Sequence, residues 1–304
     1  MDPNPPPLFP PELEREIFET AAYFYPETIQ KLLLVSHRVY KWLDGMQYAT
    51  VMAKAVEGSC PVDVLLREIQ SESRPASFFH DHVRHLYVIN RGESWDQDKN
   101  VLIQVLSACC GIHNLVLFVG VHLLKSLLPS LAAMKLRRLV ITGDALFFQV
   151  DPETSMFSSL THLYLPYDPL VHRHTAMTSR DRLPSFLAHL PVLTHFAMVA
   201  IFSNTASAAL AKDILVSCKN LQVLIVGVIE DVKLFPSIDD ARFLVFRPSG
   251  KYEFDLGWVA ETRGGIDFWA RADAFVAKKQ RGEIQPSSRC WIEFEDGIPA
   301  EGGI

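Results

Sequence analysis

The stretch LTHLYLP at residues 160–166 returns as LTHFAMV at residues 193–199. Both copies have apolar residues in the first, fourth and sixth places, and five looser copies keep this order. They read VRHLYVI from Val83, IHNLVLF from Ile112, LRRLVIT from Leu136, LQVLIVG from Leu221 and, with a weak first member, ARFLVFR from Ala241. A recurrence every 20 to 33 residues is typical of stacked strand-plus-connector units rather than of a globular enzyme. The repeats therefore predict an extended surface, which favours binding over chemistry.

The segments between these strands have the pattern of helical connectors. Apolar residues at helical spacing are found at 99–109, 122–133, 183–190 and 206–218. Parallel strands joined by helices bury their apolar faces only against neighbouring units, so stacking creates one continuous core. The expected repeat domain spans 80–285 and ends in a capping helix at 267–281, and a tail follows at 286–304. Within these ranges, the polar connector at 166–182 is expected to project as a loop, and WIEF at 291–294 to form a last strand.

The first 75 residues have a different pattern, which predicts a small helical domain. Residues 1–10 hold five prolines and are expected to be flexible. Helices are expected at 11–22, 27–43, 47–57 and 61–70. The string SESRPAS at 71–77 is the expected junction with the repeats. The predicted fold class is therefore α/β, with a helical domain at 11–75 followed by a solenoid of parallel strands and helical connectors.

Composition and charge limit the kinds of partner that this chain is expected to bind. The chain has 304 residues, 49% of them hydrophobic, and a formal net charge of −6. This length fits about two domains, and the absence of a long basic block excludes nucleic acid as an expected partner. The most apolar stretch, 115–134, is interrupted by polar and proline residues, so no membrane partner is expected. Five cysteines without C-x-x-C spacing favour a reducing compartment, and we expect a cytoplasmic or nuclear protein.

Motifs for catalysis are missing from the sequence. It contains no G-x-S-x-G, no G-x-G-x-x-G and no P-loop. His162 and His195 occupy equivalent places on neighbouring strands and could share a metal with His172 and His174, but the favoured explanation is that both occur because the same phrase occurs twice. The cysteines at 109, 110 and 218 lie on apolar faces, where a structural role is expected. We therefore expect no catalytic residue, no metal and no cofactor, and a metal-dependent enzyme is only the third hypothesis.

The alternation of side chains along a strand predicts which residues leave the core. The residues between and after the apolar positions form three rows across the sheet. We expect the following members of these rows to bind a partner: His85, Tyr87, Arg138, Val140, His162, Tyr164, His195 and Ile225. The second row is unusually apolar, as at a binding site or at a surface covered by another part of the chain. Both alternatives stay open, with the long loop or the C-terminal tail as the cover.

Two resemblances follow from these residues. The repeated phrase is similar to the leucine-rich repeat family in its irregular-length variety. The N-terminus resembles an F-box, because Phe9-Pro10-Pro11-Glu12-Leu13 and Ile17-Phe18 are followed by VSHRVYKW from Val35. Together they cover most of the chain, in an arrangement that looks like the F-box-like leucine-rich-repeat proteins abundant in mushroom-forming fungi.

The F-box resemblance implies an adaptor without catalytic residues. Such a protein docks onto a Skp-type adaptor and carries a protein substrate, here unidentified, into a cullin-type ubiquitin ligase. The positions that match the family, apart from Trp42, are implied to face the adaptor: Pro10, Pro11, Leu13, Ile17, Leu34 and Val35. Trp42 is implied to pack internally, and plain core packing is the alternative for Leu13, Ile17 and Val35. The runner-up function is a leucine-rich-repeat scaffold without a ligase.

Overall fold

The computed structural model shows one parallel β-sheet. It describes residues 9–54, 61–89, 99–119, 121–141, 150–166, 176–200, 205–228, 231–236, 238–247 and 267–292. The sheet has eight strands in sequence order, and each pairs in parallel with the next. They are β1 (Thr50–Lys54), β2 (His85–Ile89), β3 (Asn114–Phe118), β4 (Arg138–Ile141), β5 (His162–Leu165), β6 (His195–Ala200), β7 (Val223–Val228) and β8 (Phe243–Phe246). The chain is therefore an α/β protein with the order that stacked repeats require.

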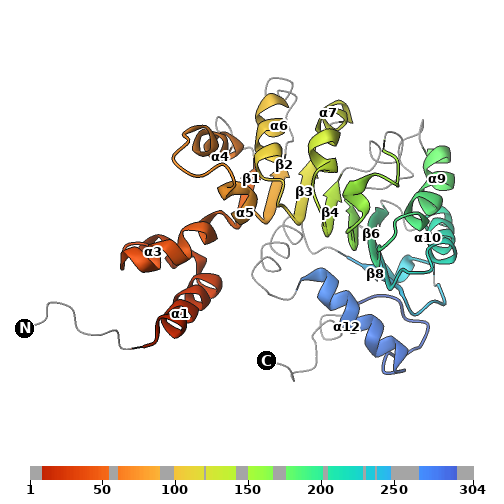
Figure 1. Cartoon of the computed structure of the whole chain (residues 1–304). Helices are drawn as coiled ribbons and strands as arrows, with labels where there is room; N and C mark the ends of the chain where they lie inside the picture. The colour runs from red at the N-terminus through yellow and green to blue at the C-terminus, as the bar shows by residue number, and fades with distance from the viewer. Residues whose placement is uncertain are drawn as a thin grey trace, which may run out of the picture.

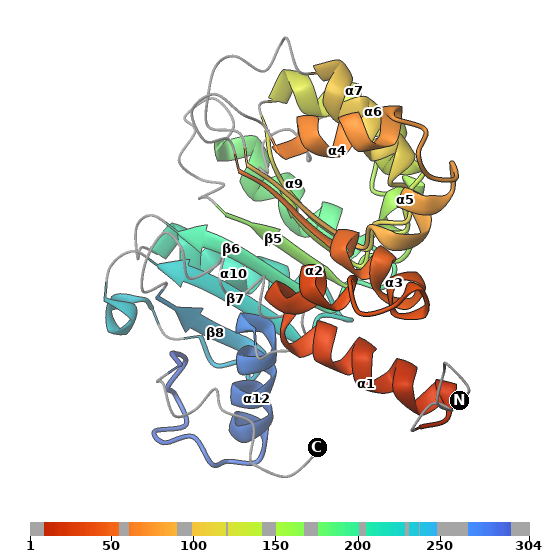
Figure 2. The same ribbon diagram turned by 90° about the vertical axis from the view of Figure 1, so that its left-hand side faces the viewer.

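Helical connectors cover one face of this sheet (Figures 1 and 2). They are α4 (Pro61–Gln70), α6 (Lys99–Ala108), α7 (Val121–Ala132), α9 (Ala176–Ala188) and α10 (Thr205–Ser217). Short 3₁₀ helices, η4 (Ser155–Phe157) and η5 (Val232–Leu234), lie in the connectors before β5 and β8. The helices expected at 99–109, 122–133 and 206–218 are confirmed to within one residue, whereas the one expected at 183–190 begins earlier, at Ala176.

The repeated apolar positions form the core between the sheet and these helices. The fourth position of the first six copies makes one row across the sheet: Leu86, Leu115, Leu139, Leu163, Phe196 and Leu224. Each member is at most 1% exposed. Burying one such side chain contributes about 1.5–3 kcal/mol. The first and sixth positions of the same copies are at most 2% exposed and belong to the same core, so all three apolar places of the phrase build it.

A second repeated feature aligns the starts of the strands. The carbonyl of the residue before a strand accepts two backbone N–H groups from the next unit. The Thr161 carbonyl, for example, accepts from the N–H groups of Thr194 and His195, both at 3.0 Å. The same double acceptance occurs at Ala49, Arg84, His113, Arg137 and Thr194. These bonds hold neighbouring units at a fixed height, so that equivalent residues fall side by side.

The register confirms the predicted rows from β2 to β7 and corrects the last strand. His85, Asn114, Arg138, His162, His195 and Val223 pair in that order. On β8, however, Phe243 pairs with Leu224 and not with Val223. Phe243 and Val245 therefore lie in the main core, and Leu244 lies on the opposite face. Because this strand is apolar at every position, alternation could not decide its register.

The N-terminal module is helical, but its second helix is broken. It contains α1 (Pro11–Phe24), η1 (Pro26–Thr28), α2 (Ile29–Leu32), α3 (His37–Leu43) and η2 (Asp44–Tyr48). A turn at 33–36 interrupts the continuous helix expected at 27–43, and Ser36 then caps α3 by accepting a hydrogen bond from the Val39 N–H. Ala22, Ile29, Val39 and Leu43 form the module's own small core, and Trp42 packs against it.

The sheet begins earlier than the sequence suggests. The helix expected at 47–57 is wrong, because β1 occupies Thr50–Lys54 and pairs with β2. Residues 55–60 lie outside the described part of the chain. The next helix, α4, was expected at this position, but Val62 and Leu65 belong to the core of the sheet. One repeat unit thus lies within the range that the pattern assigned to the helical domain.

A buried ion pair joins the N-terminal module to the first repeats. Arg74, in the SESRPAS segment, pairs with Asp44 at the start of η2, and its Nη2 lies 2.9 Å from Asp44 Oδ1. The guanidinium also lies over the rings of Tyr48 and Phe78, the latter at 4.3 Å. The hydrogen bond to Asp44 raises the pKa of Arg74, whereas burial alone would lower it. The short helix α5 (Phe78–His82), which begins at Phe78, leads directly into β2.

The face of the sheet opposite the connector helices is covered over the last strands, β6 to β8. The capping helix expected at 267–281 is confirmed as α12 (Phe268–Gln280), but it lies against the face of the sheet opposite the connector helices (Figure 1). Trp291 forms a single parallel bridge with Val245 in place of the expected strand at 291–294, whose last two residues are outside the described part. The expected flexible residues 1–8, the loop residues 167–175 with His172 and His174, and the tail from 293 also lie outside it.

Candidate functional site

An exposed apolar stripe runs along α1. The helix starts at Pro11, where a missing N–H has no consequence, and Pro10 precedes it. Its inner side packs through Phe18 and Ala22 into the module core. Its outer side carries Leu13 and Ile17, which are 49% and 52% exposed. Plain core packing, the alternative for these two residues, does not describe their positions.

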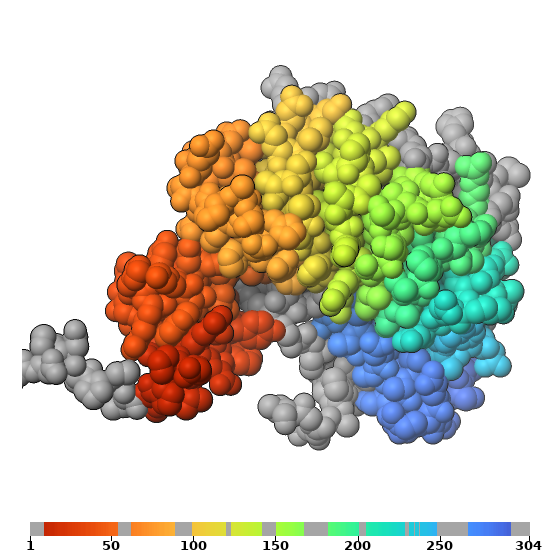
Figure 3. Space-filling model, viewed as in Figure 1, coloured from red at the N-terminus to blue at the C-terminus, as the bar shows by residue number. Residues whose placement is uncertain are grey.

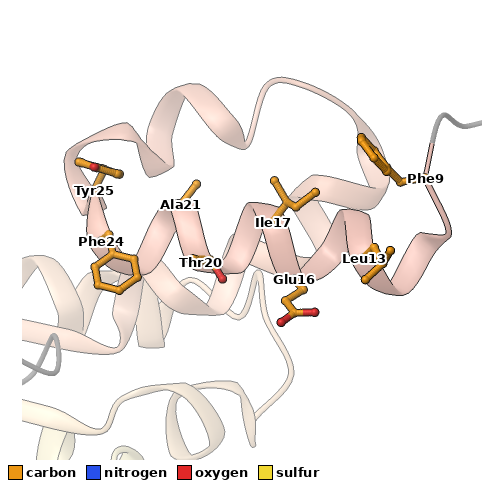
Figure 4. Close-up of a pocket in the computed structure, with 8 residues that line it drawn as sticks. All are labelled: Phe9, Leu13, Glu16, Ile17, Thr20, Ala21, Phe24 and Tyr25. Carbon is orange, nitrogen blue, oxygen red and sulfur yellow. The ribbon is translucent and has the colours of Figure 1, made fainter. Parts of the chain in front are cut away.

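The stripe borders an open groove of about 460 Å³ (Figure 4). The lining residues come from α1 and its two ends: Phe9, Leu13, Glu16, Ile17, Thr20, Ala21, Phe24 and Tyr25. Apart from Glu16 and Thr20, with the hydroxyl of Tyr25, they present carbon atoms to solvent. Contiguous exposed apolar surface of this kind normally marks a site that binds another protein or a ligand.

A second exposed apolar element is the turn between α2 and α3. Leu34 is 86% exposed and Val35 is 58% exposed. The turn is held by backbone hydrogen bonds from Leu34 to Lys31 and from Val35 to Leu32, at 3.2 and 3.0 Å. These hydrogen bonds fix the backbone of the turn, which presents both side chains to solvent.

The α1 helix is tied to α3 by charge as well as by packing. Arg38 on α3 donates to Glu14 on α1 at 2.6 Å. This ion pair joins α1 to α3, which directly follows the exposed turn, so it stabilises the mutual placement of the two exposed apolar regions. Figure 3 shows the module standing out from the body that the repeats form. All six residues expected to face an adaptor, from Pro10 to Val35, lie exposed on this module.

Sequence reasoning missed part of this surface. Phe9, Phe24 and Tyr25 line the groove, and Phe24 and Tyr25 are among the most exposed aromatic side chains described. Tyr23 and Phe24 contact each other edge to face, with ring centroids 5.4 Å apart. The signal was present as the aromatic run YFYP at 23–26, directly before the proline that ends the helix.

The face expected to bind a target is largely buried. Of the eight residues predicted there, Tyr87, Val140, His195 and Ile225 are buried, and the other four are partly buried. Ile225 packs under α12 with Ala197, Val223 and Leu244, against Trp269, Ala272, Phe275 and Val276 of that helix. The face is therefore covered at β6 to β8, but mainly by α12, which was expected to cap the end of the stack; from the tail at 286–304, Ile292 packs against the same cluster. The apolar row is core in this region.

Polar residues of the first row also contact α12. Arg138 Nη1 lies 3.0 Å from Asp267 Oδ2, and Asp267 caps the helix by accepting from the Ala270 N–H at 2.7 Å. His195 Nε2 lies 2.9 Å from Asp273 Oδ1. The predicted polar row thus meets carboxylates, but they belong to the chain itself.

Burial keeps two of the cysteine thiols protonated at neutral pH. Burial raises the pKa of the Cys109 thiol to about 12 and that of Cys218 to about 11. A thiol with such a pKa is a poor nucleophile at neutral pH. His162 and His195 stack with ring centroids 4.1 Å apart. Among the described residues, no three histidine, cysteine or acidic side chains are arranged to hold a metal ion.

No protein-family model matches the chain, and no curated protein matches it. None of the helices in the described part combines the length and the apolarity that crossing a membrane requires. The exposed apolar surface of the N-terminal module is thus the strongest candidate site.

Proposed function

We propose that the chain is a non-catalytic adaptor whose N-terminal module docks onto a Skp-type protein. In this proposal the repeats carry a protein target into a cullin-type ubiquitin ligase. The F-box-like sequence phrases and the leucine-rich-repeat-like phrases remain its sequence basis.

The exposed apolar residues of the module carry the proposal. Leu13, Ile17, Leu34 and Val35 are the positions that the F-box resemblance assigns to the adaptor, and all are exposed. An exposed leucine or isoleucine contributes about 1.5–3 kcal/mol when it is fully buried in a complex. Several such side chains on one rigid module are enough to anchor a partner with an apolar surface.

The first test is binding of the full-length chain to a purified Skp-type adaptor. We expect the wild-type chain to bind, and Leu34→Asp to weaken binding at least about tenfold, because a charge would enter an apolar contact. Leu34 is almost fully exposed, so the variant should keep the wild-type unfolding midpoint. Val216→Asp is the matched control, because Val216 is 67% exposed on α10 of the repeat region.

The outcomes separate the ligase function from the runner-up. Failure of the wild-type chain to bind, while an established F-box protein binds in the same assay, would remove the ligase part of the proposal. The scaffold function then remains, and affinity purification would recover the same targets from wild type and Leu34→Asp. In the ligase function, Leu34→Asp keeps those targets but slows their ubiquitin-dependent turnover.

A further inference from the structure

The second position of the repeated phrase forms a row along one edge of the sheet. This residue directly precedes its strand, and its carbonyl accepts backbone N–H groups from the next unit, so neighbouring members lie about 4.8 Å apart at the backbone. From the start of β2 to that of β7 the row reads Arg84, His113, Arg137, Thr161, Thr194 and Gln222. The basic members therefore come from three consecutive units, toward the N-terminal end of the sheet.

These three basic side chains share one electrostatic environment. Burial lowers the pKa of His113, and the positive charges of Arg84 and Arg137 lower it further, so both guanidinium groups act on the same imidazole. A hydrogen bond to the Lys135 backbone acts in the opposite direction. Lys135, two residues before Arg137, is exposed and adds another cation. We call the four residues Arg84, His113, Lys135 and Arg137 the basic rim.

The basic rim has no carboxylate partner in the described part of the chain. Asp81, on α5 just before β2, is held by His80, with Oδ1 and Nδ1 2.7 Å apart. At the other end of the sheet, Arg242 holds the second position of the last copy, and its Nη2 lies 2.7 Å from Asp240 Oδ2. The chain thus neutralises this position at Arg242 and leaves the basic rim uncompensated among the described residues.

Arg84 is held in place and still has free donors. Its Nη1 donates to the carbonyl groups of His80 and Gly111 at 3.3 and 3.0 Å, whereas its other nitrogen atoms have no hydrogen-bond partner among the described residues. Gly111 permits this approach, because a Cβ there would collide with the His80 carbonyl oxygen. Lys135 and Arg137 are exposed, and their side chains make no hydrogen bond within the described ranges. The basic rim therefore combines one fixed guanidinium with two side chains that can extend toward a partner.

We infer that the basic rim binds an acidic segment of a partner protein, rich in aspartate or glutamate. The fork of N–H donors on an arginine matches the two oxygens of a carboxylate. An extended segment of about four residues is long enough to span the three units. That this partner is the target of the ligase rests on the proposed function, whereas the binding itself does not.

An acidic protein segment fits the basic rim better than a nucleic acid does. The formal net charge of the chain is −6, which disfavours a long polyanion that extends beyond the basic rim. Sequence-independent binding of single strands relies on base stacking as well as on charge. None of the four members is a phenylalanine, tyrosine or tryptophan. A short run of carboxylates needs only the cations that the basic rim supplies.

Fluorescence anisotropy with the full-length chain and a labelled peptide of about six glutamates, enough to span the basic rim, tests the inference. We expect the wild-type chain to bind at about 50 mM salt and more weakly at about 300 mM, because salt screens exposed charges. Lys135→Gln/Arg137→Gln should weaken binding by about fivefold, since two exposed ion pairs are lost. Both side chains are exposed, so this variant should keep the wild-type unfolding midpoint.

Lys212→Gln/Lys219→Gln is the matched control, because it removes two exposed cations on and just after α10. It changes the net charge equally and should bind the peptide as the wild type does. Absence of wild-type binding, or an equal loss in both double variants, would overturn the inference. So would an oligonucleotide of equal charge that binds the wild-type chain more tightly than the peptide.

The same assay separates this inference from adaptor docking. Leu34→Asp alters the N-terminal module and leaves the basic rim intact, so it should bind the peptide with wild-type affinity. A loss of peptide binding in Leu34→Asp would place the peptide on the module and contradict the inference. Adaptor docking and peptide binding can therefore fail independently of each other.

Discussion

His85 begins β2, where its ring is a hydrogen-bond acceptor. The amide Nδ2 of Asn114 donates to His85 Nδ1 at 3.0 Å, so a proton on that nitrogen would remove the bond. Burial, together with the positive charges of His113, Arg138 and Arg84, lowers the pKa of His85 to about 4. An unfolded histidine binds a proton near pH 6.5, so acid favours unfolding between these two values.

We therefore expect stability to fall with decreasing pH because of His85. Its share is about 2 kcal/mol at pH 5 relative to neutral pH. His85→Gln, which keeps an acceptor for Asn114, should reduce the acid-induced loss of unfolding free energy by this amount in urea titrations. His37→Gln, at an exposed histidine of α3, serves as the control. Equal pH profiles for wild type and His85→Gln would contradict the prediction.

For single residues, the sequence could predict which side of a strand or helix a side chain lies on, but not which residues it contacts there. The tripeptide Leu-Thr-His gives two histidines the same place, yet within the described ranges only His195 meets a carboxylate. Its partner Asp273 is 78 residues away in the sequence, so the repeated phrase could not predict this contact. Leu13 and Ile17 likewise have a helical spacing that suits a buried face and an exposed one equally. Which of these applies depends on where Phe18 and Ala22 pack.

Among the contacts between elements, the ion pair of Asp44 in η2 with Arg74, just before α5, should have the most easily measured effect on stability. The side chains of Arg74 and Asp44 are only 18% and 12% exposed. Removing one partner of a buried pair leaves the other charge without compensation, which costs about 3–5 kcal/mol. Gly45 adds to the close fit, because a Cβ there would collide with the ring of His82.

We expect Arg74→Leu to lower the free energy of unfolding by about 3 kcal/mol. The double variant Arg74→Leu/Asp44→Leu should lose less than the sum of the two single variants, because neither charge then remains. Urea unfolding of the four proteins gives the coupling energy. Arg281→Leu, which breaks an exposed pair with Glu283, should stay within about 0.5 kcal/mol of wild type. An additive cycle would mean that the two residues do not interact.

Elements were predictable where periodicity was distinct. The connector helices α6, α7 and α10 follow from a 3.6-residue pattern, and β2 to β7 from the repeated phrase. The strand β1 was missed because Thr50–Lys54 lacks the leucines of the phrase, and only its pairing with β2 defines it. For β8, apolar residues on both faces left two registers, and the position of Leu244 under α12 selects one.

On the scale of the whole molecule, the sheet has core on both faces. Val140 packs with Tyr87 and Val116 on the face opposite the connector helices, and Tyr164 packs against this cluster. A carboxylate at position 140 would therefore enter an apolar environment without a partner. For an open recognition face, by contrast, the same change would affect binding alone.

We expect Val140→Asp to destabilise the folded chain by at least about 3 kcal/mol. Thermal unfolding followed by circular dichroism measures the loss, with Val216→Asp on the outer surface of α10 as the unaffected control. Retention of the wild-type midpoint by Val140→Asp would show that this face is accessible, and would restore it as a surface for a target.

The order of the strands has a consequence for how the chain is made on the ribosome. Because each strand pairs with the one before it, β1 to β8 can dock one by one as they emerge. The helix α12 begins about 70 residues after β6, and at the usual translation speed this delay lasts roughly 4–14 s. Until α12 has been made, the apolar residues of those strands among β6 to β8 that have already emerged lack its cover. Nascent chains should therefore recruit a chaperone at this stage of synthesis, and release it when α12 has folded back.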